Sequence, residues 1–143
     1  MGFQATLAAM TDWTSSAAPS LDDFARLAEA ALQALPAHFR KMAGDVEMRV
    51  AEFAEDAVLD DLGIEDAFDL TGLYHGVDLA RRSAFGAPPG PSMVFLYRRP
   101  ILDEWCERGD VTLGQLISHV LVHEIGHHFG LSDADIEAIE GRD

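Results

Sequence analysis

The sequence contains a single cysteine, Cys106, and few basic residues. One cysteine excludes an internal disulfide and a cysteine-rich zinc knuckle. No apolar run approaches the ~20 residues that a membrane-spanning helix requires, so no membrane partner is expected. The start of the chain lacks the basic and then apolar segments of a secretory signal. These absences together predict a cytoplasmic protein.

Acidic residues dominate the charge. The chain has 10 lysines and arginines against 25 aspartates and glutamates, which gives a net charge of -15. This acidic protein repels nucleic-acid phosphates, so no nucleic-acid partner is expected. Eight of the carboxylates lie between Glu52 and Asp69. We interpret this segment as a solvated acidic helix and loop, and the alternative is a surface that attracts a basic substrate.

The length fits one domain. With 143 residues, of which 48% are hydrophobic, the chain has enough apolar material for a core. Residues 1–19 are rich in alanine, serine and threonine without sustained periodicity, which predicts a flexible N-terminal arm. Residues 20–143 are then the single domain. We find no repeat and no signal for an oligomeric state.

Two segments in the first half show clear periodicity. Ser20 and Asp23 form an N-cap pair, and apolar residues recur at helical spacing from Leu21 until Pro36. This predicts a first, amphipathic helix that packs on a sheet. At 46–50 apolar and charged residues alternate, which is typical of a half-buried strand.

Two more short strands are expected at 72–76 and 92–97, separated by a loop with Arg81, Arg82 and the turn-rich APPGP sequence. We expect Pro100 to end the second strand and a short helix to follow at about 101–107.

A longer helix opens at the capping box of Thr112 and Gln115. Its apolar residues from Leu113 to Phe129 cover nearly the whole circumference, which predicts a central, buried helix. Ser132 and Asp135 can cap a last short helix that ends near residue 140.

The segment 123–133, HEIGHHFGLSD, carries most of the chemistry. His123 and His127 are four residues apart, so on a helix both imidazoles share one face and can bind one zinc ion. Glu124 lies beside them, where a carboxylate can take a proton from a zinc-activated water. Gly130 accepts a positive φ, which lets the chain turn back and bring Asp133 to the metal as third ligand.

Three residues of this region have plainer interpretations. Asp133 is also suited to the first turn of a helix, where an acidic side chain stabilises the helix dipole. His119 shares the face of His123 and His127, so it is a candidate metal or supporting residue, although a hydrogen-bonded core histidine is the commoner outcome. His128 is rotated about 100° from His127 and is expected to be structural, hydrogen-bonded to the sheet or a loop.

The chain resembles the small bacterial zincin-like metallopeptidases. The resemblance rests on Gly72 to Arg82 (GLYHGVDLARR), Pro88 to Ile101 (PPGPSMVFLYRRPI) and His119 to Asp133 (HVLVHEIGHHFGLSD). It implies an α+β, minimal zincin-like fold: a small mixed β-sheet packed on a backing helix and a central active-site helix. It also implies that His123, His127 and Asp133 bind one zinc ion per chain, with Glu124 as the catalytic base.

The implied function is zinc-dependent hydrolysis of a peptide or protein substrate. For the strand edge that the peptide follows, our candidate is Met93 to Tyr97. Tyr74, His75 and Tyr97 are the candidate donors to the oxyanion, with packing as their commoner role. The alternatives are a non-catalytic interaction module that zinc stabilises and a zinc hydrolase that acts on a non-peptide substrate.

Overall fold

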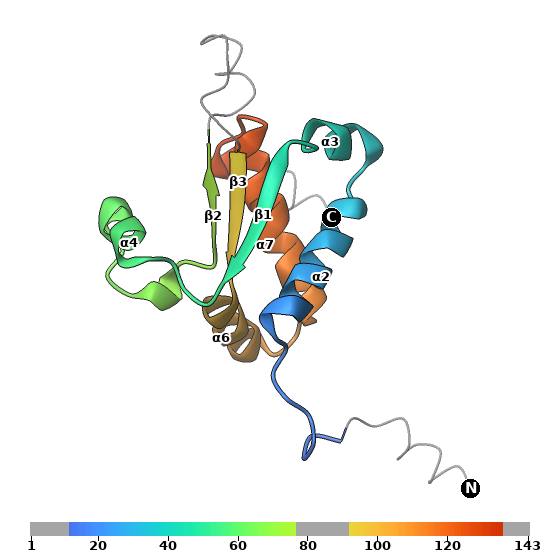
Figure 1. The fold of residues 1–143 in the computed structure, drawn as a ribbon, viewed down its shortest axis with the longest axis vertical. Coiled ribbons are helices and arrows are strands. Elements are labelled where there is room, and N and C mark those ends of the chain that lie inside the picture. Colours follow the sequence, from blue (N-terminus) through green and yellow to red (C-terminus); the bar gives the residue numbers. More distant parts are fainter. Residues whose placement is uncertain (1–11, 77–91, 136–143) are drawn as a thin grey trace, which may run out of the picture.

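A three-stranded mixed sheet forms the centre of the protein. The computed structural model describes residues 12–76 and 92–135 (Figure 1). The strands are β1 (Val46–Ala51), β2 (Gly72–His75) and β3 (Ser92–Tyr97), in the order β1-β3-β2. β1 runs parallel to β3, and β2 runs antiparallel to it. The predicted α+β fold with a small mixed sheet is therefore confirmed.

Helices α2 (Leu21–Gln33) and α7 (Leu113–His128) pack against each other and against the sheet (Figure 1). Both begin at the predicted capping boxes, in which each cap residue and the residue three positions later exchange hydrogen bonds. These bonds satisfy main-chain N–H groups that have no partner inside the helix. None of the described helices is long and apolar enough to cross a membrane.

β3 is apolar on both faces because both faces of this strand are covered. Val94 and Leu96 are fully buried against α2 and α7, in a core that includes Phe24, Ile117 and Leu121. Complete burial of each such side chain contributes roughly 1.5–3 kcal/mol before entropy losses. On the opposite face a smaller cluster buries Tyr97 with Ala54 and Leu59. The central strand thus joins two apolar layers.

Four shorter helices complete the described fold: α3 (Ala37–Met42), α4 (Asp56–Leu62), the 3-10 helix η1 (Ala67–Asp69) and α6 (Arg98–Arg108). Seven of the eight carboxylates between Glu52 and Asp69 are exposed, so the solvated interpretation of this acidic segment is confirmed. The prediction for Pro100 was wrong. The strand ends at Tyr97, and Pro100 is the third residue of α6, where the N–H that proline lacks has no helical partner to lose.

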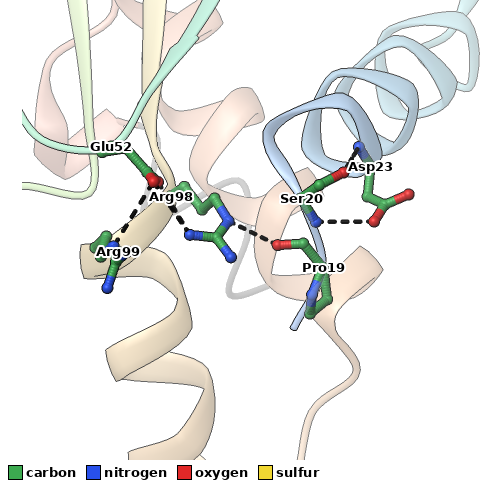
Figure 2. A network of polar contacts seen from close by, with 6 residues as sticks. All are labelled: Pro19, Ser20, Asp23, Glu52, Arg98 and Arg99. Atoms are coloured by element: carbon green, nitrogen blue, oxygen red, sulfur yellow. Dashed lines mark hydrogen bonds and ion pairs between the residues drawn. The ribbon is translucent and has the colours of Figure 1, made fainter. Parts of the chain in front are cut away.

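Arg98 ties α6 to two distant segments, as Figure 2 shows. Its Nη1 lies 3.0 Å from Glu52 Oε1, just after β1, and its Nε donates to the Pro19 carbonyl at 2.6 Å. Glu52 also pairs with Arg99 at 3.7 Å. The last residue of the predicted arm is therefore held against the domain.

Some predictions concern other parts of the chain. Residues 1–11 of the predicted arm, the loop with Arg81 and Arg82, and the end of the last short helix lie outside the described residues.

Candidate metal centre

His123 and His127 lie one turn apart near the end of α7, with ring centroids 5.2 Å apart. The Nε2 atoms of both rings lie near the same carboxylate oxygen, Oδ1 of Asp133. Asp133 Oδ1 lies 3.1 Å from His123 Nε2 and 3.1 Å from His127 Nε2. Asp133 is 73% exposed, so burial does not account for its position between two histidines.

The turn after α7 brings Asp133 there. Gly130 has the predicted positive φ, 85°. The Gly130 N–H donates to the His127 carbonyl, and the Leu131 N–H donates to the Gly126 carbonyl, both at 3.0 Å. This pair of bonds is a Schellman motif, which ends a helix and reverses the chain. The sequence pattern therefore works as predicted at this turn.

Asp135 takes the capping role that we predicted for it. Its carboxylate accepts from the Ser132 N–H at 3.1 Å, and the Ser132 hydroxyl accepts from the Asp135 N–H at 3.2 Å. These bonds start the last helical turn at residue 133. Asp133, in that first turn, is left to face the histidines.

A main-chain carbonyl orients the His127 ring. His127 Nδ1 lies 3.2 Å from the Leu131 carbonyl oxygen. A carbonyl can only accept, so Nδ1 carries the proton and donates it. The lone pair is then on Nε2, the nitrogen that faces His123 and Asp133.

Glu124 points to the edge of the sheet at β2. A Cβ built on Gly72 would lie 3.3 Å from Glu124 Cγ, and the Tyr74 main chain hydrogen-bonds the Glu124 carboxylate. Burial raises the pKa of this carboxyl group above its usual value. His123, His127 and the bond from Tyr74 oppose the rise, and Asp133 adds to it. A carboxyl group with a raised pKa is better able to hold a proton during a reaction.

The donor set fits zinc. Donor atoms of His123, Glu124 and His127 all lie within 4.8 Å of one another. The imidazole nitrogens of the two histidines and the carboxylate oxygen of Asp133 are donors that zinc prefers. In a tetrahedral site with bonds of about 2.0–2.1 Å, the ligand atoms are about 3.3 Å apart. The 3.1 Å separations from Asp133 Oδ1 are close to that spacing.

The two remaining histidines of α7 have different environments. His128 is fully buried, with Nδ1 2.8 Å from the Tyr74 hydroxyl and Nε2 3.4 Å from an Asp45 carboxylate oxygen. The predicted structural role, with a bond to the sheet, is confirmed. His119 is exposed, so its interpretation as a core histidine was wrong.

A groove leads away from the site along α7. The groove has a volume of about 280 Å³. Its lining includes His119, His123 and Glu124 of α7, Glu104 and Arg108 of α6, and Asp69 of the segment before β2. A second groove of about 340 Å³ lies on the other face of the sheet, over Leu73, Phe95 and Tyr97. Sequence reasoning found His123 and Glu124 but missed Asp69, Glu104 and Arg108, because none of these three belongs to a recognisable motif.

The expected substrate edge was wrong. Met93 to Tyr97 lies in β3, which is hydrogen-bonded to a strand on each side. The strand next to Glu124 is β2, an edge strand of the described sheet.

The three candidate oxyanion donors are dispersed. The Tyr74 hydroxyl contacts His128 and Ser92, Tyr97 is buried with Leu59, and His75 lines the groove on the other face.

Comparison with known families agrees with this geometry. A sequence model described as zincin-like metallopeptidase matches residues 43–142. The chain belongs to the zincin-like metallopeptidase family. No curated protein matches the chain. The match includes all three strands, α7 and the turn to Asp133, so the zincin-like part of the chain contains the whole candidate metal centre.

Proposed function

We propose that this zincin-like protein is a zinc-dependent peptidase, with His123, His127 and Asp133 as metal ligands and Glu124 as general base. One observation supports this most strongly: a single oxygen of Asp133 lies 3.1 Å from the Nε2 atoms of both histidines. Three protein ligands leave a fourth tetrahedral position open, which is typical of catalytic and not structural zinc sites. Zinc, when bound, polarises a substrate carbonyl and lowers the pKa of water toward ~7.

Glu124 supplies the proton transfers. Its carboxylate accepts a proton from the attacking water and then donates it to the leaving amine. The Tyr74 main chain holds the carboxylate at the β2 edge, and burial raises its pKa, so the protonated form is accessible between these two steps. The same side chain therefore acts first as base and then as acid.

Within the described sheet β2 is an edge strand, and its outer side is suited to hold an extended peptide. The Tyr97 N–H donates to the Thr71 carbonyl at 2.9 Å, and Leu73 is opposite Phe95 two residues further on. In an antiparallel pair the main-chain groups of alternate residues face the partner, so those of Gly72 and Tyr74 face away from β3. The Tyr74 N–H is directed to Glu124, so Gly72 supplies the main-chain groups for the peptide. A peptide paired there lies beside Glu124, with side chains directed alternately to the two grooves.

The two alternatives are less well supported. A non-catalytic module has no need of an acidic side chain that the main chain of a strand holds beside the metal ligands. A non-peptide hydrolase has no need of an edge strand of the described sheet next to that carboxylate.

The test is hydrolysis of a mixed peptide library by the zinc-loaded protein, with cleavage sites read by mass spectrometry. Glu124→Gln is the matched variant, because the amide keeps the shape of the side chain but cannot accept the proton. We expect cleavage by the parent and a loss of at least ~100-fold in the variant. Equal cleavage by both proteins, or none by the parent across the library, would contradict the proposal.

A further inference from the structure

A polar chain connects the end of α7 to the edge of the sheet. The Tyr74 hydroxyl, on β2, lies 2.8 Å from His128 Nδ1 and 3.1 Å from Ser92 Oγ. His128 and Ser92 are fully buried. At the far side of the imidazole, Asp45 Oδ1 lies 3.4 Å from Nε2. The chain His128–Tyr74–Ser92 thus links α7 to β2 and β3, and Asp45, the residue before β1, lies beside its His128 end.

Space around this chain is closely filled. A Cβ built on Gly76, just after β2, would lie 2.7 Å from Ser92 Oγ and 3.0 Å from the Tyr74 hydroxyl oxygen. The Tyr74 and His128 rings are tilted against each other with centroids 5.6 Å apart. The hydroxyl has little room to change its partners without a shift of the strand.

The anchored residue is the one that contacts the proposed base. The Tyr74 hydroxyl contacts His128, and the Tyr74 main chain approaches the Glu124 carboxylate closely enough to lower its pKa. Glu124 and His128 are four residues apart on α7, so one strand residue binds two successive turns of the helix. β2 has only four residues, and in the described sheet its ladder is the one with β3, so this ladder alone holds it weakly.

We infer that Tyr74 and His128 are positioning residues, which hold the β2 edge so that the Tyr74 main chain meets the Glu124 carboxylate. The consequence for catalysis rests on the proposed peptidase function. Loss of the hydroxyl lets the strand move relative to α7, so Glu124 samples orientations that do not face the attacking water. Substrate binding, which uses the remaining length of the edge and the grooves, changes less than turnover does.

The test is Tyr74→Phe, which removes one oxygen and keeps the ring. The readout that does not depend on activity is amide hydrogen exchange, measured by NMR at the Tyr74 N–H. We expect this amide to exchange about 10-fold faster or more in the variant, with amides of α2 unchanged. Glu124→Ala, which removes the acceptor, is expected to accelerate the same amide.

Trp105→Phe is the matched control. It also removes a partly buried hydrogen bond of an aromatic side chain, from Nε1 to the Val111 carbonyl at 2.9 Å, but on α6. We expect it to lower thermal stability without a change in Tyr74 exchange or in kcat. In Tyr74→Phe we expect kcat to fall about 10-fold, while KM changes less than about 2-fold and bound zinc is unchanged. A loss of about 10-fold is the usual scale when a residue that supports a functional group is removed.

Each outcome has one meaning. Unchanged Tyr74 exchange in Tyr74→Phe overturns the inference, whatever the activity. Faster exchange with an unchanged kcat overturns the positioning role and leaves Tyr74 as a stability residue. If the parent cleaves no peptide, the proposed function fails, while the exchange comparison still decides whether the network holds the edge.

Discussion

Gly72 of β2 lies so close to Glu124 of α7 that a Cβ on the glycine would stand 3.3 Å from Glu124 Cγ. The same atom would lie 2.7 Å from Val120 Cγ1, closer than nonbonded carbons approach in folded proteins. The absence of a side chain at Gly72 therefore allows α7 and the sheet edge to lie this close together.

Gly72→Ala is expected to destabilise the fold by roughly 1–3 kcal/mol, because a methyl group has to be fitted into a filled interface. Chemical denaturation measures the change. In a Val120→Ala background the loss should be smaller, and a double-mutant cycle gives the coupling. The control is Gly114→Ala, whose Cβ would have its nearest neighbour at 3.9 Å. Equal effects at the two glycines would contradict the steric argument.

Purified protein is expected to hold about one zinc ion per chain, and chelation should lower its melting temperature. The metal joins α7 to the segment after it, and a ligand that binds only the folded state stabilises it by about 2.7 kcal/mol at a free concentration 100 times its Kd. Elemental analysis and thermal unfolding with and without chelator are the measurements. A protein that takes up no zinc on titration would rule out this metal centre.

Asp133→Ala is expected to weaken zinc binding at least ~10-fold, since loss of even a supporting partner of a zinc ligand has that effect. Asp135→Ala is the control and should leave zinc affinity nearly unchanged, because the Asp135 carboxylate accepts a hydrogen bond from the Ser132 N–H. Competition with a zinc indicator compares the two variants. If Asp133→Ala binds zinc as the parent does, Asp133 is a helix-cap residue and the histidines need another partner.

Asp23 makes the first helix sensitive to acid. Hydrogen bonds from the Ser20 main chain and side chain, then Arg26, lower the pKa of Asp23 from 3.8. Because the pKa of Asp23 is lower in the folded state, the stabilisation by its carboxylate is complete above pH 3.8. This stabilisation is lost as the pH falls through the pKa of Asp23 in the folded protein.

Asp23→Asn should therefore be less stable than the parent at neutral pH, with a difference that shrinks as the pH falls below 3.8. Denaturant titrations at several pH values measure the difference. Asp22→Asn, one residue away and outside the capping box, is the control and should lower stability at neutral pH less than Asp23→Asn does. A constant gap between Asp23→Asn and the parent would contradict the linkage.

Local signals in the sequence predicted most elements of the fold. The capping boxes at Ser20 and Thr112 act within one helical turn, so both helices begin where the pattern indicates. The turn at Gly130 is equally local, and it brings Asp133 to the two histidines.

The order of the strands could not be predicted from local patterns. β3 pairs with β1, more than 40 residues earlier, and only this pairing makes it central. The nearly continuous apolar run SMVFLY was a usable signal, because strands covered on both faces lose their alternation. The contacts of Tyr74 with His128 and Glu124 likewise depend on how β2 meets α7, which no spacing in the sequence encodes.

The position of β2 at the edge of the described sheet affects how copies of this protein meet. An unpaired strand edge accepts any extended chain, including a strand of another copy. Each copy carries a net charge of -15, so two copies repel each other before their edges come into contact. The outer strand β1 also presents exposed charges at Glu47 and Arg49. The acidic surface therefore opposes the pairing of two copies through their β2 edges and their assembly into continuous sheets.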